Sequence, residues 1–103
     1  MGVEVGQDAS PEARAAQETL IEVYAARDMA RVRDWARRFG EESKEWYDAA
    51  QYGSAVLMLT AEELTELNGR IRELMRPYRR RERVGPPEGS RPVMVHYAAL
   101  PME

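Results

Sequence analysis

The sequence has no cysteine and only one histidine among its 103 residues. The lack of cysteine excludes disulfides, thiolate metal sites and cysteine nucleophiles, and it fits a cytoplasmic protein. The single histidine, His96, has no acidic neighbours at metal-ligand spacing. The chain also has no Ser-His-Asp arrangement and no glycine-rich phosphate loop. We therefore expect no metal, no cofactor and no catalytic residues, which means a protein that is not an enzyme.

Long apolar runs and an excess of basic charge are also missing. No apolar run approaches the roughly 18–20 residues that cross a bilayer, and the first ten residues do not resemble a signal peptide, so we expect no membrane partner. The formal net charge is -3, so binding to nucleic acid would need a local basic patch. The chain length fits one domain with a thin core, because a domain of this size buries only about 65% of its unfolded surface.

The first part of the chain predicts a short leader and then a long helix. Residues 1–9 are small and polar, and we expect them to be disordered. Residues 10–12, Ser-Pro-Glu, form a strong helix start, and no glycine or proline follows until Gly40. The resulting helix would be about 30 residues and about 45 Å long. Its apolar residues form two stripes that go out of step near Arg27, which predicts either a bend or different partners along its length.

The second part of the chain predicts a strand-helix-strand arrangement. Residues 55–59 are a short apolar run, and residues 92–100 are rich in β-forming residues, so both are predicted strands. Between them, residues 60–63 form a capping box that starts a helix, Pro77 disfavours its continuation, and we expect the helix to end near residues 78–81. The predicted fold class is α+β, in a single domain over residues 10–103.

Two shorter connections complete the sequence-based description. A short helical turn is expected near residues 45–50, and a loop is expected over residues 82–91, which contain two prolines and two glycines.

A sheet of only two strands is marginal in water, and the long helix has more apolar face than one small partner can cover. We therefore expect the fold to be completed by homodimerisation, with the strand orientation left open.

Aromatic and large apolar residues gather along the long helix and the turn that follows it, and the end of that helix is surrounded by the aromatics Trp35, Phe39, Trp46, Tyr47 and Tyr52. One interpretation is a core with a dimer seam, and the other is a small-molecule effector pocket. The candidate dimer or pocket residues are Leu20, Tyr24, Trp35, Phe39, Trp46 and Tyr52.

Residues 76–83 contain five arginines and one glutamate. Cations suit the C-terminal end of a helix, where the helix dipole is negative, so one interpretation is a solvated cap. The other is a set of phosphate contacts. The segment has no helix-turn-helix pattern of the kind that reads bases. The candidate phosphate contacts are Arg76, Arg79, Arg80 and Arg81.

Three segments resemble the C-terminal part of actinobacterial ArsR-like winged-helix transcriptional regulators: EWYDA (45–49), AVLMLTAEELTELNGRIRELMRPYRRR (55–81) and RPVMVHYAALP (91–101). The resemblance extends from near Trp35 to Pro101. It implies a non-enzymatic dimerisation and effector module, a homodimer that reaches DNA only through a domain absent from this chain. The winged-helix half and the cysteine metal sites of some relatives have no counterpart here.

Two other functions fit the same residues. The chain could be a stand-alone interaction module, such as a regulator antagonist or an antitoxin-like protein, with the long capped helix as its binding surface. It could also be a small enzyme with an aromatic pocket, and His96 and Glu62 would then be the groups to test.

Overall fold

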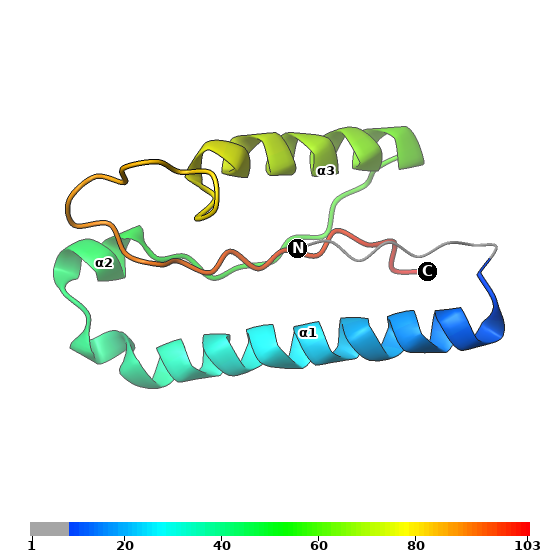
Figure 1. Cartoon of the computed structure of the whole chain (residues 1–103), viewed down its shortest axis with the longest axis horizontal. Coiled ribbons are helices and arrows are strands. Elements are labelled where there is room, and N and C mark those ends of the chain that lie inside the picture. Colours follow the sequence, from blue (N-terminus) through cyan, green and yellow to red (C-terminus); the bar gives the residue numbers. More distant parts are fainter. Residues whose placement is uncertain (1–8) are drawn as a thin grey trace. The chain divides into compact units, whose positions relative to one another are not determined.

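The computed structural model describes residues 9–103, which contain three α-helices and two short 3₁₀ helices and no β-strand (Figure 1). The chain divides after Gly53 into two compact units. The single domain expected over residues 10–103 stays a prediction, and the expected leader lies outside the described residues except for Ala9. The elements are α1 (Pro11–Arg38), η1 (Phe39–Glu41), α2 (Lys44–Ala49), α3 (Ala61–Met75) and η2 (Arg76–Tyr78).

Helix α1 begins where the sequence predicted. The Ser10 hydroxyl accepts a hydrogen bond from the amide of Ala13 at 3.2 Å, and Pro11 occupies the first turn. The helix is 28 residues long and continuous, so it spans about 42 Å. It continues through Asp28, whose carboxylate pairs with the guanidinium of Arg27 at 3.4 Å. The expected helix is confirmed, with its end at Arg38 just before the chain tightens into η1.

Helix α2 is a short helix that carries its own cap. The Ser43 hydroxyl accepts a hydrogen bond from the amide of Trp46 at 3.3 Å, and Lys44 pairs with Asp48 one turn later at 2.6 Å. The helical turn expected near residues 45–50 is confirmed, one residue earlier than predicted.

Helix α3 starts with the predicted capping box. The Thr60 hydroxyl accepts a hydrogen bond from the Glu63 amide at 3.1 Å, and the Glu63 carboxylate accepts one from the Thr60 amide at 2.9 Å. Two of the amides that a helix leaves without partners at its start are satisfied in this way. The helix ends at Met75, and the chain continues through η2, which contains Pro77.

The prediction of an α+β fold is wrong. Residues 55–59 and 92–100, expected as strands, take no part in a β-ladder in the described chain. Hydrophobic and β-branched composition favours a strand only where the backbone finds a partner and one face is covered. Here Val56 is 75% exposed and Met58 is 93% exposed, so no surface holds this segment in a sheet. The strand-helix-strand arrangement is therefore replaced by irregular segments that precede and follow α3.

No residue in the described part of the chain is buried. The least exposed side chains of α3 lie on one face at spacings of three and four, and they are only half-buried: Leu64, Leu67, Asn68, Ile71 and Met75. The helices thus depend on their caps and local bonds more than on a hydrophobic core.

Candidate functional site

Three aromatic rings meet where α1 turns through η1 into α2. The ring centroids of Trp35 and Phe39 are 5.9 Å apart, and those of Phe39 and Tyr47 are 5.8 Å apart, both in tilted arrangements. Trp35 lies one turn before Phe39 on the same face, so the helix itself sets the first contact. We call Trp35, Phe39 and Tyr47 the aromatic cluster. It is partly open to solvent, because Phe39 is 44% exposed.

The structure brings together only some of the residues predicted for a dimer seam or pocket. Trp35 and Phe39 belong to the aromatic cluster, and Trp46 is half-buried on α2. Leu20 lies fifteen residues before Trp35 on α1, which is about 22 Å along the helix. Tyr52 follows α2 and is 75% exposed. The structure thus brings Trp35 and Phe39 together with Tyr47, which the sequence placed among the aromatics at the end of the long helix, and a dimer seam or pocket at these residues stays a prediction.

Exposed apolar side chains gather near the middle of α1. Leu20, Ile21 and Val23 are 42%, 43% and 56% exposed, although aliphatic side chains of this size are usually buried. Tyr24 lies beside them, with the Arg27 guanidinium over its ring at 5.0 Å from the centroid. Leu20 and Val23 are three residues apart and lie on one face of α1, and we call these two residues the central apolar patch; Ile21 lies on a different face. Exposed apolar side chains on one face of a helix are available for contact with another protein surface.

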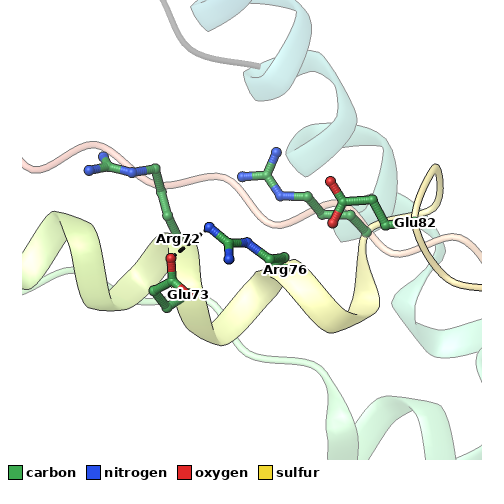
Figure 2. Close-up of a pocket in the computed structure, with 5 residues that line it drawn as sticks. Arg72, Glu73, Arg76 and Glu82 are labelled. Carbon is green, nitrogen blue, oxygen red and sulfur yellow. Dashed lines mark hydrogen bonds and ion pairs between the residues drawn. The ribbon is translucent and has the colours of Figure 1, made fainter.

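A shallow recess of about 240 Å³ lies at the C-terminal end of α3 (Figure 2). Arg76 reaches across it to Glu73, and its guanidinium pairs with the carboxylate at 2.7 Å. Both side chains are well exposed, so this ion pair contributes no more than about 1 kcal/mol. The lining residues are Arg72, Glu73, Arg76, Arg79 and Glu82.

The recess includes two of the four arginines that were predicted to contact phosphate. Arg76 and Arg79 line it, but two carboxylates accompany them, which offsets most of the positive charge. Arg80 and Arg81 are not among its lining residues. The contact of these arginines with phosphate stays a prediction. Of the two acidic residues at the recess, only Glu73 could have been predicted from the sequence. It precedes Arg76 by three residues, and side chains at this spacing on a helix are neighbours.

The ionisable groups show little that suits acid-base chemistry. The hydrogen bonds that Glu63 accepts from the backbone amide and then the hydroxyl of Thr60 lower the pKa of its carboxyl. A carboxylate held ionised in this way serves as a cap and is a poor general acid near neutral pH. Within residues 9–103 no cluster of three or more histidine, aspartate or glutamate side chains could hold a metal ion. None of the helices in that range is long and apolar enough to cross a membrane.

Comparison of the chain with protein-family models, curated proteins and solved structures finds no match. The surfaces described above are an aromatic cluster, a central apolar patch and helices that bury nothing among the described residues. The recess on α3 adds a mixed-charge rim.

Proposed function

We propose that this chain is a non-enzymatic self-association module that forms a homodimer. We further propose that it serves as the dimerisation and effector part of a winged-helix transcriptional regulator in the cytoplasm. The observation that supports self-association is the absence of any buried residue in the described chain, although its three α-helices are well capped. Amphipathic helices gain most of their stability when their apolar faces pack against another surface, and this chain has no core of its own that could provide it.

Exposed apolar side chains support the same conclusion, because the contacts of obligate dimers are rich in such side chains. Leu20, Phe39 and Leu74 are examples of the apolar side chains available, and each is more than 40% exposed.

The regulator part of the proposal is supported by the resemblance of residues 45–49, 55–81 and 91–101 to winged-helix regulators of the ArsR-like type. In this arrangement a separate domain reads DNA bases, and the arginines after α3 contribute at most phosphate contacts. A small effector would bind beside the aromatic cluster. The net charge of -3 agrees with a chain that does not bind DNA strongly by itself.

Self-association is tested by sedimentation equilibrium, with circular dichroism recorded over the same range of protein concentration. We expect a mass of twice 11.8 kDa at high micromolar concentration and helix content that falls as the chain is diluted. A chain that stays monomeric and keeps its full helix content at every concentration would overturn the proposal.

The regulator assignment has its own test, the intact mass of the native protein isolated from its own cells. We expect a polypeptide heavier than 11.8 kDa by at least one winged-helix domain. A native mass equal to that of this chain would remove the regulator assignment and would leave the homodimer proposal in place. Attention would then move to the stand-alone interaction module.

A further inference from the structure

Arginines are concentrated around the C-terminal end of α3. Residues 70–83 contain seven arginines and two glutamates, which gives this segment a net charge of +5, whereas the whole chain has a net charge of -3. The helix dipole favours cations in the last turn of a helix, but Arg79, Arg80 and Arg81 follow the last helical residue, Tyr78. The dipole therefore does not account for all of this charge.

Three of these arginines share the recess at the end of α3. Arg72, Arg76 and Arg79 are spaced by four and three residues along α3 and η2, so their side chains lie on one side of this segment. Like charges at this spacing repel each other. All three line the recess of about 240 Å³, whose other lining residues are Glu73 and Glu82 (Figure 2).

The three guanidinium groups differ in their partners. Arg76 pairs with Glu73 at 2.7 Å, so these two charges offset each other within the chain. Among the described residues, neither Arg72 nor Arg79 forms an ion pair. The recess thus holds two positive charges that no carboxylate of the described chain pairs with at short range.

The position of Arg79 is set by backbone hydrogen bonds. Its amide donates to the carbonyl of Arg76 at 3.2 Å, and its own carbonyl accepts from the amides of Glu82 and Arg83, both at 2.9 Å. Arg79 is half-buried, whereas Arg80 beside it is exposed. A side chain placed by its own turn in this way lies at the recess before any ligand arrives.

Two guanidinium groups without ion pairs suit a ligand that carries two negative charges. Guanidinium groups donate paired hydrogen bonds to phosphate oxygens. A terminal phosphate carries a charge of about -1.5 to -2 near neutral pH, whereas a phosphodiester of nucleic acid carries a single charge. We infer that the recess binds the terminal phosphate of a small molecule, with Arg72 and Arg79 as its hydrogen-bond donors and Glu82 as the charge that limits affinity. All of these residues lie within one chain, so the inference does not rest on the proposed homodimer.

Methyl phosphate and dimethyl phosphate are matched probes of this site, because they share the phosphate group and differ in charge. Each is titrated into the full chain at constant ionic strength, which keeps the screening of charges equal. The Nε–Hε resonances in NMR spectra report on each arginine separately. We expect methyl phosphate to shift those of Arg72 and Arg79 until they saturate, and to bind about tenfold more tightly than dimethyl phosphate. Arg33 and Arg37 on α1, which also form no ion pair among the described residues, are internal controls.

The other outcomes overturn the inference. Equal affinity for the two probes, or equal shifts at Arg33 and Arg37, would mean a general attraction of anions to the chain. Duplex DNA is a third titrant, and a response to DNA without one to methyl phosphate would assign the arginines to the nucleic acid backbone. None of these readouts depends on the oligomeric state. A monomer in sedimentation would therefore remove the proposed homodimer and leave this site unaffected.

Single substitutions test the role of each charge. Arg79→Gln removes one charged donor, and we expect methyl phosphate to bind about tenfold more weakly. Glu82→Gln removes the opposing charge and should strengthen binding about threefold. The matched control, Arg37→Gln, removes the same charge from α1 and should leave the affinity unchanged, and circular dichroism checks the helix content of each variant. Unchanged affinity in Arg79→Gln, or weaker binding in Glu82→Gln, would contradict the assignment.

Discussion

Thr60 and Glu63 each satisfy a backbone amide of the other: the hydroxyl of Thr60 accepts from the Glu63 amide at 3.1 Å, and the Glu63 carboxylate accepts from the Thr60 amide at 2.9 Å. The two bonds hold the first turn of α3, which follows an irregular segment. Because no buried residue stabilises α3 in the described chain, these two hydrogen bonds contribute much of the stability of its first turn.

The capping box makes the stability of α3 depend on pH. The pKa of Glu63 is lowered in the folded chain by the bonds from Thr60, so its stabilising effect is complete above the ordinary glutamate pKa of about 4.3 and is lost as pH falls through the lowered value. We expect Glu63→Gln to flatten this part of the pH profile of thermal unfolding. Thr60→Ala should lower stability by about 1 kcal/mol at neutral pH. If the loss of thermal stability at low pH is the same in Glu63→Gln as in the unchanged chain, then other carboxyl groups cause that loss.

Phe39 joins the end of α1 to α2, because its ring contacts both Trp35 and Tyr47. Phe39→Ala removes both contacts, and aromatic pairs contribute about 0.5–1.5 kcal/mol each beyond their buried area. We expect a lower unfolding temperature and a weaker near-ultraviolet circular dichroism signal. Tyr52→Ala is the matched control, since that ring is 75% exposed. Equal losses in the two variants would argue against a specific role for Phe39.

The central apolar patch should be necessary for self-association. Leu20→Glu places a charge at the patch, and we expect the dimer dissociation constant to rise by more than about tenfold, because an unpaired charge would be desolvated in the interface. Ala25→Glu adds the same charge five residues later, at an exposed position on the opposite face of α1. Sedimentation of both variants compares the two dissociation constants. Similar weakening by Ala25→Glu would indicate a general charge effect.

The arginines after α3 should differ in their effect on binding to phosphate. Arg76 already pairs with Glu73 at 2.7 Å, so Arg76→Ala should change the weak affinity for duplex DNA less than Arg79→Ala does. Each phosphate contact that is lost should reduce the slope of log affinity against log salt by about 0.9. Fluorescence anisotropy over a range of salt concentrations measures both quantities. A larger effect for Arg76→Ala would contradict this order.

The starts of the helices could be predicted from the sequence because caps are local. Ser10 with Pro11, and Thr60 with Glu63, act within three residues of one another, and both predictions are confirmed. The cap of α2 at Ser43 is equally local, but its helix is too short to show an apolar period. The predicted strands failed for the opposite reason. Strand formation at residues 55–59 depends on a partner backbone that no local pattern specifies.

The candidate site could be predicted only in part. Spacing of four residues on one helix was enough to associate Trp35 with Phe39. Tyr47 was expected beside them because it lies in the short segment that follows the long helix, and its ring does contact Phe39. Glu82, in contrast, joins Arg72 and Arg76 at the recess because the chain turns after η2, and no helix period predicts that contact. The aromatic cluster was therefore predicted from the sequence, whereas the recess was not.

In the proposed homodimer, a protomer that buries none of its described residues would link its own folding to its abundance. When folding and pairing are one equilibrium, halving the total concentration lowers the folded fraction as well as the paired fraction. Newly made chains would be open to proteases until they meet a partner, and chains in the dimer would be protected. The cell would then hold the paired form above a threshold set by synthesis and degradation, and dosage itself would act as a control on activity.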